Sequence, residues 1–360
     1  TFMREWLSLY ESKSGERGIF NRKSAQVQAA KNGRRDAEQD FGCNPCSEII
    51  LRPYQFCNLS EVVARAGDSV EDLKKKVRLA TILGTFQSTL TDFKYLRKVW
   101  KDNTEEERLL GVSLTGILDN DVLSGKSAKY GMNIDNILEE LKQMAVHTNA
   151  SLAHEIGISE STAITCVKPS GTVSQLVDSA SGIHARHSEY YIRTVRGDNK
   201  DPLTQFMVSQ GVPAEPDVMK PDSTTVFSFP MKSPMGAVTR TEMTAIQQLD
   251  LWLKYQRHWC EHKPSVTISV KEEEWMDVGS WVYKHFDEVS GISFLPFSEH
   301  TYKQAPYQDC SKEEYEDMKR KMPKSVDWTW LQEYEKEDTT SGGRELACTA
   351  GVCEVVDLTA

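Results

Sequence analysis

The sequence predicts an α/β protein with a mostly parallel sheet. Short β-branched and apolar segments at residues 162–167, 265–270 and 291–296 have the composition of buried strands. Longer segments with apolar residues at helical spacing precede and separate them. Strands that alternate with helices are typical of an α/β architecture. At 360 residues the chain is long enough for one large domain or two ordinary ones.

The longest helical segments lie in the first half of the chain. Residues 69–100 predict one long helix, whose start is marked by Ser69 and Asp72 at the spacing of a capping box. Its apolar positions recur near helical spacing and are Leu73, Val77, Ala80, Phe86, Leu90 and Phe93. Residues 133–157 predict a second helix, which ends at Gly157.

In the second half, the strand at 265–270 is followed by a helix over 272–289 and by the strand at 291–296. From residue 307 onward the sequence becomes more charged and less periodic. Residues 339–360 predict a mobile tail, so the cysteines there are not expected in the core.

Composition excludes several classes of protein. No segment approaches the roughly 20 apolar residues that a membrane-spanning helix needs. The net charge of -10 argues against a nonspecific nucleic-acid binder, which needs a basic face, but leaves room for a nucleotide site. The chain has 8 cysteines, too few for a disulfide scaffold, and its first ten residues do not resemble a signal peptide. We therefore expect a protein of the reducing cytoplasm, where grouped cysteines are metal-binding or catalytic.

The segment FGCNPCSEIILRPYQFCNLSEVV, residues 41–63, allows three interpretations. Zinc binding would need Cys43 and Cys46 to converge with the tail cysteines, whose C-x4-C spacing is looser than that of most structural sites. A thioredoxin-like pair would place C-x-x-C at a helix start, whereas Pro45 and the β-favouring residues that follow indicate a loop. Cys166 and Cys260 lie in apolar or helical surroundings and are expected to be inert.

The third interpretation is a reactive thiol beside a carboxylate. In an extended chain, residues two apart point to the same side, which brings together Asn44, Cys46 and Glu48. Such a loop presents an amide, a sulfur and an acid or base to one substrate.

A second candidate site is the sequence KPSGTVS, residues 168–174. It is not a Walker A sequence, but small residues after a strand let backbone N–H groups approach phosphate oxygens. An ordinary β-turn is the alternative. The candidate phosphate-binding residues are Pro169, Ser170, Gly171, Thr172, Val173 and Ser174.

Several long motifs, in one order along the chain, resemble ribonucleotide reductases of the monomeric adenosylcobalamin-dependent class. They are SKSGERGIFNR, NPCSEI, CNLSEVV, KPSGTVSQLVDSASGIHARHSEYYIRTVR, PSVTISV, GISFLPFSEHTYKQAPY and ELACTAGVCEVVDL. The resemblance implies a ten-stranded α/β barrel with a finger loop threaded through it, of which this chain holds the C-terminal part. Residues 1–310 would belong to the catalytic barrel, and residues 311–360 would form a charged extension and a redox tail.

The resemblance also implies a role for each cysteine of the mechanism. Cys46 would carry a thiyl radical that takes the 3′-hydrogen of a ribonucleotide. Cys57 would be one of two thiols that reduce the 2′ carbon and end as a disulfide. Cys348 and Cys353 would re-reduce that disulfide by exchange, with a thioredoxin-type reductant as partner.

Further implications concern the remaining groups. Glu48 would be the general base at the 3′-hydroxyl, and Asn44 would hold the ribose by hydrogen bonds. The loop at 169–174 would bind the substrate phosphates of a ribonucleotide, with a triphosphate implied by this class and a diphosphate left open. The cofactor would be adenosylcobalamin, and no metal site is expected.

Two alternatives remain open. The partner thiol of Cys57 is expected from an early strand that this sequence does not contain, so the chain would need an N-terminal half of the same enzyme, supplied by a split gene or lost by truncation. It could then be an incomplete segment that only docks to that half. It could also be the large subunit of a diiron-dependent reductase. A tyrosine pair next to the phosphate loop would favour that class, but Tyr190 and Tyr191 lie well past this loop.

Overall fold

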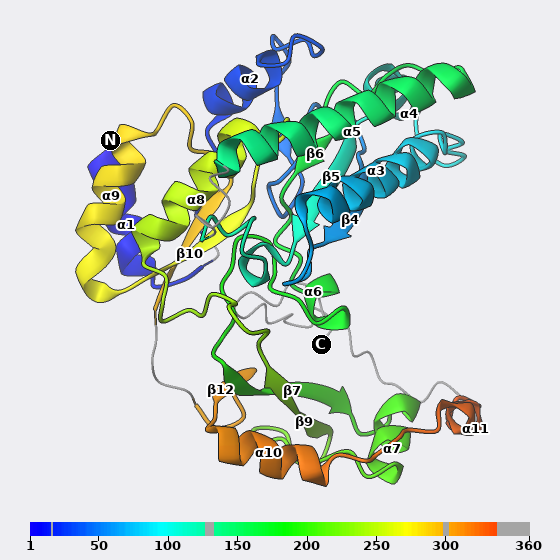
Figure 1. Ribbon diagram of the computed structural model, residues 1–360, viewed down its shortest axis with the longest axis vertical. Coiled ribbons are helices and arrows are strands. Elements are labelled where there is room, and N and C mark those ends of the chain that lie inside the picture. The colour runs from blue at the N-terminus through cyan, green and yellow to red at the C-terminus, as the bar shows by residue number, and fades with distance from the viewer. Residues whose placement is uncertain (16, 127–132, 298–301, 337–360) are drawn as a thin grey trace, which may run out of the picture. The chain divides into compact units, whose positions relative to one another are not determined.

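The computed structural model describes residues 1–15, 17–126, 133–297 and 302–336. These residues form two compact units (Figure 1). The first comprises Thr1–Ala185 and Met235–Phe297, and the second comprises Arg186–Pro234 together with the described residues from 302 onward. No helix in the described ranges combines the length and the apolar character that crossing a membrane requires.

The first unit is α/β. Its helices are α1 (Phe2–Ser12), α2 (Arg22–Ala30), α3 (Val70–Gln87), α4 (Lys98–Glu107), α5 (Ile134–Ile156), α6 (Val173–Leu176), α8 (Ala245–His258) and α9 (Trp275–Lys284), with 3-10 turns at Ile117–Asp119 and Glu272–Glu274. Its strands are β1 (Gly18–Ile19), β2 (Gly42–Cys43), β3 (Ile50–Leu51), β4 (Asn58–Val63), β5 (Leu110–Thr115), β6 (Thr165–Cys166), β10 (Val266–Val270) and β11 (Ile292–Pro296).

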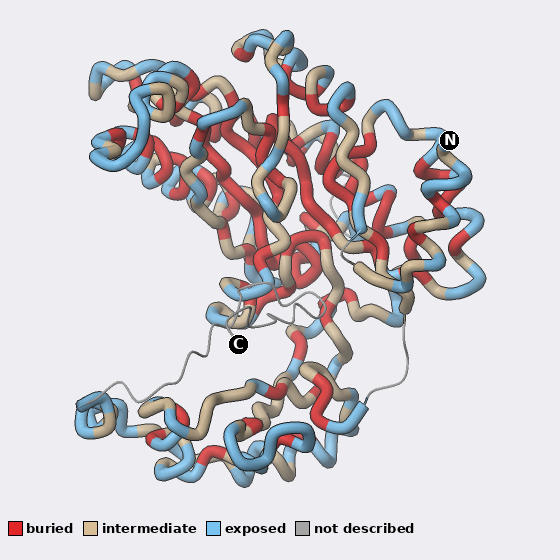
Figure 2. Tube along the Cα trace, turned by 180° about the vertical axis from the view of Figure 1, so that it is seen from behind, coloured by how far each residue is buried: buried red, intermediate tan, exposed pale blue. Residues whose placement is uncertain are grey.

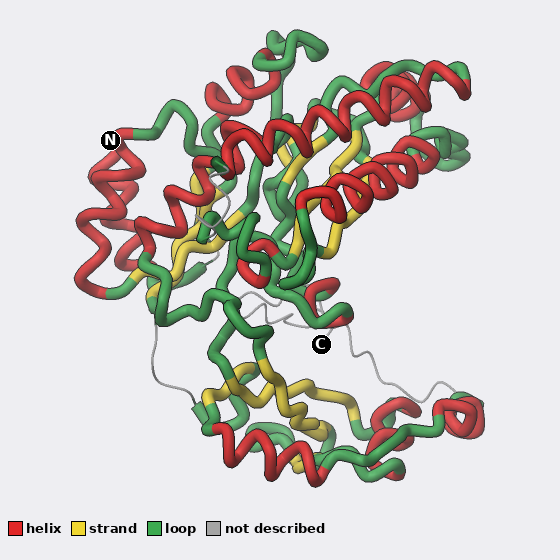
Figure 3. Tube along the Cα trace, viewed as in Figure 1, coloured by secondary structure: helices red, strands yellow, loops and turns green. Residues whose placement is uncertain are grey.

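A parallel sheet of order β4-β5-β6 lies at the centre of this unit. Asn58 to Val63 pair with Leu110 to Thr115 along the full length of β4 and β5. The long helices α3 and α5 lie side by side over this sheet, as Figure 3 shows. Every residue of β5 is buried, which agrees with a strand that is covered on both faces.

A second sheet, of order β1-β11-β10, pairs β10 with β11 in parallel and β1 with β11 antiparallel. The buried residues follow the strands and the inner helix faces (Figure 2). Two fully buried tryptophans at α8 tie this core together, because their indole N–H groups donate to strand-end carbonyls. Trp252 donates to Pro264 O at 2.8 Å, and Trp259 donates to Cys166 O at 2.7 Å.

The expected helix ends are partly confirmed. Ser69 and Asp72 form the capping box of α3, and Gly157 ends α5 in the left-handed conformation with φ 74°. The single helix over 69–100 is wrong, because α3 ends at Gln87 and α4 begins only at Lys98. The hydroxyls of Ser88 and Thr89 donate to carbonyls of the last turn of α3 at 2.6 and 2.7 Å, so they satisfy groups that a continuing helix would need.

The second unit departs from the predicted parallel architecture. Its strands β7 (Tyr190–Asp198), β8 (Ala214–Pro216), β9 (Thr224–Lys232) and β12 (Tyr307–Asp309) form an antiparallel sheet of order β12-β7-β9-β8. Its helices are α7 (Pro202–Ser209), α10 (Lys312–Lys321) and α11 (Leu331–Tyr334), with a 3-10 turn at Trp328–Trp330. The charged segment after residue 307 is therefore more regular than predicted, since α10 begins with a capping box formed by Ser311 and Glu314.

Candidate active site

The loop that carries the candidate thiol and carboxylate lies between two short paired strands. Cys43 of β2 pairs with Ile50 of β3, which closes the base of the loop. Inside it, Ser47 N donates to Asn44 O at 2.9 Å, and the Asn44 side chain accepts from Ile49 N at 3.0 Å. Ser47 has a left-handed φ of 68°. The expected extended backbone is therefore wrong, because the chain turns between Asn44 and Ser47.

Despite the turn, the predicted thiol and carboxylate meet at one cation. Lys168 Nζ lies 3.8 Å from Cys46 Sγ and 3.5 Å from Glu48 Oε1. Cys46 is half-buried, whereas Glu48 is fully buried. At 3.5 Å the contact with Glu48 is an ion pair at the outer limit of a hydrogen bond, and no shorter hydrogen bond from a described residue reaches either carboxylate oxygen. Sequence analysis did not single out Lys168 for this contact.

His262 holds the end of the loop against the central sheet. It is fully buried, accepts from Ile50 N through Nδ1 at 3.3 Å and donates to Leu110 O through Nε2 at 2.8 Å. Burial, assisted by the charge of Arg35, lowers the pKa of His262 to about 3. The imidazole is therefore neutral, as its one donor and one acceptor contact require.

Lys263 holds the middle of the loop. Its backbone N–H donates to Glu48 O at 3.0 Å, and its ammonium donates to the hydroxyls of Ser47 at 3.3 Å and Ser290 at 3.2 Å. The side chain is fully buried, and burial lowers the pKa of Lys263 to about 8. Neither His262 nor Lys263 was expected from the sequence, since both lie more than 200 positions from the loop that they contact.

Cys57 lies directly before β4 and is half-buried. Burial, assisted by the charge of Glu48, raises the pKa of the Cys57 thiol to about 12, while Lys168 acts in the opposite direction. Cys57 is thus within electrostatic reach of both groups, and its sulfur is a protonated thiol at neutral pH.

The other cysteines divide by their surroundings. Cys166 and Cys260 are buried as expected, at 0% and 1% exposure, and burial raises the pKa of each thiol well above its ordinary value. None of the six cysteines in the described ranges is in a disulfide. Within those ranges, no cluster of three or more His, Cys, Asp or Glu side chains could hold a metal ion. The tail cysteines Cys348 and Cys353 lie outside the described residues.

The candidate phosphate loop begins at Lys168, whose backbone N–H donates to Ser113 Oγ at 2.8 Å. Ser170 is buried, has a left-handed φ of 55°, and donates its hydroxyl to the Glu61 carboxylate. Burial raises the pKa of Glu61, against the opposing effects of Ser170 and Lys168. Gly171 and Thr172 are exposed, so their backbone is open to a ligand.

The helix expected after this loop is a single turn. It is α6, at Val173–Leu176, with Ser174 buried and its N–H donating to Ser170 O at 3.1 Å. So short a helix adds little dipole, and a phosphate site here would depend on the loop's own N–H groups.

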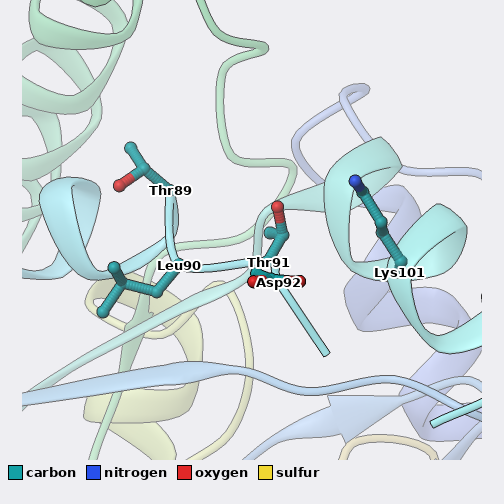
Figure 4. A pocket seen from close by; sticks show the side chains of 5 residues that line it. All are labelled: Thr89, Leu90, Thr91, Asp92 and Lys101. Carbon is teal, nitrogen blue, oxygen red and sulfur yellow. The ribbon is translucent and has the colours of Figure 1, made fainter. Parts of the chain in front are cut away.

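A separate surface hollow lies at the C-terminal end of α3. Figure 4 shows its lining residues, which are Thr89, Leu90, Thr91, Asp92 and Lys101. None of them belongs to the loop at 44–49 or to the loop at 168–174, so the hollow is not part of the candidate active site.

Sequence comparison finds relatives over most of this chain. It is 28% identical over 320 residues to the adenosylcobalamin-dependent ribonucleoside-triphosphate reductase of Euglena gracilis, a match that covers 87% of the chain and 42% of the relative. It is 27% identical over 376 residues to the enzyme of the same name from Lactobacillus gasseri, covering 95% of the chain and 49% of the relative. The chain thus spans less than half the length of these relatives. No family model matches it.

Structure comparison agrees with the sequence comparison. The fold superposes on the crystal structure of a B12-dependent (class II) ribonucleotide reductase with a TM-score of 0.75 and 21% identity, over 93% of this chain and 50% of that one. The chain therefore has the α/β fold of part of a ribonucleotide reductase.

Proposed function

We propose that this chain is the C-terminal portion of an adenosylcobalamin-dependent ribonucleoside-triphosphate reductase, which reduces ribonucleotides to 2′-deoxyribonucleotides by radical chemistry. The names of its relatives support the substrate class and the cofactor. Their greater length supports a catalytic unit that is completed by an N-terminal half. The whole protein would form a ten-stranded barrel, with residues 1–310 in it and residues 311–360 as the charged extension and redox tail.

One observation carries this proposal. Glu48 is a fully buried carboxylate that meets the Lys168 ammonium at 3.5 Å, and the same ammonium lies 3.8 Å from the Cys46 sulfur. No shorter hydrogen bond from a described residue reaches either carboxylate oxygen, so the carboxylate keeps the capacity to accept one from a further partner. The 3′-hydroxyl of a ribonucleotide has the required chemistry, because it can donate its hydrogen bond and then its proton to Glu48.

We assign the roles of the loop residues in keeping with this arrangement. Cys46 takes the 3′-hydrogen as a thiyl radical and returns it at the end of the turnover, while Glu48 acts as general base at the 3′-hydroxyl. Asn44 holds the ribose by hydrogen bonds. Its side-chain oxygen already accepts from Ile49 N, which leaves the amide N–H2 for this contact.

Reduction at the 2′ carbon needs two electrons and releases the hydroxyl as water. Cys57 supplies one thiol of the pair that becomes a disulfide, and its raised pKa keeps that thiol protonated before it reacts. Cys348 and Cys353 re-reduce that disulfide by thiol exchange and are themselves reduced by a thioredoxin-type partner.

The substrate phosphates are assigned to the loop Pro169, Ser170, Gly171, Thr172, Val173 and Ser174. The exposed backbone of Gly171 and Thr172 supports this assignment. When bound, adenosylcobalamin supplies the radical that starts the reaction. One observation agrees with a site for this cofactor. Cys46 is half-buried, so its sulfur can exchange a hydrogen atom with a group outside the loop. We also assign the protein to the cytoplasm.

The test mixes this chain with its matching N-terminal half, a ribonucleoside triphosphate, dithiothreitol and adenosylcobalamin. We expect deoxyribonucleotide only when both halves and the cofactor are present. Cys46→Ser should abolish it, whereas the matched variant Cys43→Ser, at the end of β2 directly before the turn, should retain it. Turnover by the Cys46→Ser mixture would refute the radical assignment.

The same mixture separates the alternatives. A segment that only docks would bind the N-terminal half, and Cys46→Ser would then leave the activity of the complex unchanged. A diiron-dependent large subunit would turn over without cobalamin once a radical-supplying protein is added.

A further inference from the structure

Lys168 is the cation that joins the loop at 44–49 to the candidate phosphate loop at 168–174. Its Nζ lies 3.8 Å from Cys46 Sγ and 3.5 Å from Glu48 Oε1. Its backbone is fixed on two sides, because its N–H donates to Ser113 Oγ and the preceding residue Val167 bridges to Pro264. The side chain is 27% exposed, so it reaches the buried carboxylate from the edge of the site.

The charges around Lys168 explain why this position matters. A fully buried carboxylate is strongly destabilised in its ionised form, unless a cation is close. The second buried ammonium of the site, Lys263, donates to Ser47 and Ser290 and acts on Glu48 only through its charge. The titratable groups that interact electrostatically with Lys168 are Cys46, Glu48, Cys57, Glu61 and Cys166. Among these, the ion pair is formed with Glu48.

Lys168 itself stays charged in this setting. Burial would lower its pKa, but the Glu48 carboxylate and the Cys46 sulfur more than offset that effect, so the pKa of Lys168 is raised. The ammonium and the carboxylate thus form a pair of no net charge directly beside the thiol.

We propose that Lys168 is a positioning residue that acts through Glu48: its ammonium keeps this buried carboxylate ionised at neutral pH and aims it at the place where Cys46 reacts. The catalytic purpose of the Glu48 carboxylate rests on the proposed function. Its protonation state does not, because it depends on burial and on the Lys168 ammonium. Without Lys168, the carboxylate takes up a proton and can no longer act as a base. Lys168→Arg keeps the charge and should preserve the state of Glu48.

The first test records the infrared C=O stretch of protonated carboxyl groups in the full chain at neutral pH. Relative to the wild type and to Lys168→Arg, Lys168→Met should gain a band of about one buried acid per chain. The double variant Lys168→Met/Glu48→Gln should lose that band, which separates it from any signal of Glu61. Identical spectra for the wild type and Lys168→Met would overturn the proposal.

The second test follows alkylation of Cys46 by iodoacetamide across pH, with mass spectrometry to locate the label and Cys43 as internal reference. Removing the cation that lies 3.8 Å from the sulfur should move the midpoint for Cys46 up, but by less than the roughly one to three pH units of a lone cation, because Glu48 is neutralised at the same time. Lys94→Met, the same change at an exposed lysine, should move nothing. A Lys168→Met midpoint equal to that of the wild type would count against the contact.

The third test uses turnover by the mixture with the N-terminal half. Lys168→Met should shift the acid limb of the rate profile to higher pH, and Lys168→Arg should restore it. A purely structural role would lower the rate at all pH values alike and would overturn the proposal. Absence of turnover in the wild type would refute the proposed function, while the infrared and alkylation results would still decide the role of Lys168.

Discussion

Lys263, a fully buried lysine, is energetically the most costly residue of the candidate active site. Lys263 is 0% exposed, its ammonium contacts two hydroxyls, and it lies 4.3 Å from the centre of the Phe20 ring. Burial lowers the pKa of Lys263 from 10.5 to about 8, although electrostatic interactions with Cys43 and Glu48 act in the opposite direction. The protein therefore retains an unfavourable group that fixes the loop through Ser47.

We expect Lys263→Met to stabilise the protein at pH 7 and to weaken the site. The lowered pKa corresponds to a penalty on the order of 3 kcal/mol, from which about 1 kcal/mol is subtracted for each lost hydrogen bond. A net gain of about 1 kcal/mol in the free energy of unfolding is expected, with lower turnover because Ser47 loses its donor.

The pH dependence of this stability gain has a definite sign, because Lys263 is a base whose pKa is lower in the folded state than in the unfolded state. The penalty is fully present below pH 8 and is relieved as the pH rises to 10.5, so the gain of Lys263→Met should vanish over that window. Urea unfolding at pH 7 and pH 10 measures it, with the exposed Lys94→Met as control. A variant that is less stable than the wild type at pH 7 would contradict the expectation.

Residues whose neighbours are close in sequence could be predicted, and residues whose neighbours are distant could not. Cys46 and Glu48 share one short loop, and their types alone suggested a thiol beside a base. Lys168, His262 and Lys263 reach that loop from over 100 positions away, so no local pattern indicates their contacts.

At the scale of elements, helix starts were predictable for the same reason. The capping box of α3 and the glycine that ends α5 are local signals. The end of α3 was missed because hydroxyls of Ser88 and Thr89 compete for carbonyls, which apolar periodicity does not reveal. The antiparallel sheet of the second unit was missed because its main strands, β7 and β9, are largely half-exposed and lack a continuous apolar run.

The backbone around the candidate phosphate loop has little freedom to move. A substitution at Gly182 tests this. Its φ is +49°, and a Cβ there would lie 2.6 Å from Lys168 O and 3.5 Å from the Cα of Pro169. Gly182→Ala should therefore destabilise the protein by more than the roughly 1–2 kcal/mol of a left-handed alanine, since backbone must move. The displaced loop should bind a nucleoside triphosphate more weakly.

Gly33→Ala is the matched control, because Gly33 also has a left-handed φ, +66°, but nothing lies within 4 Å of a Cβ there. Urea unfolding gives the stability change, and calorimetry in the presence of the N-terminal half compares a triphosphate with the corresponding nucleoside. Equal destabilisation by the two substitutions, or equal loss of both ligands for Gly182→Ala, would show that the contact with Lys168 does not control the loop.

At the scale of the whole molecule, the candidate active site comes from one compact unit. The loop at 44–49, Cys57, Glu61, the loop at 168–174 and the pair His262 and Lys263 all belong to the first unit. The α/β class of that unit was predicted from alternating strands and helices, and it is confirmed. The redox tail is a prediction of a different kind, since Cys348 and Cys353 lie outside the described residues and are assigned from the sequence alone.

The last prediction decides between a redox and a zinc role for this tail. If Cys348 and Cys353 are shuttle thiols, the double serine variant, mixed with the N-terminal half, should complete about one reduction per active site and then stall with thioredoxin as reductant. Dithiothreitol should restore multiple turnover, because a small dithiol can reach the disulfide of Cys57 directly.

If the tail instead binds zinc together with Cys43 and Cys46, the same variant should lose the metal and stability, and dithiothreitol should rescue nothing. Cys43→Ser separates the two outcomes further. It removes a zinc ligand but no shuttle thiol, so the redox assignment requires that it leave both thioredoxin-dependent turnover and thermal stability nearly unchanged. Stoichiometric zinc in the wild type, lost in both variants without rescue by the dithiol, would replace the redox assignment with a structural one.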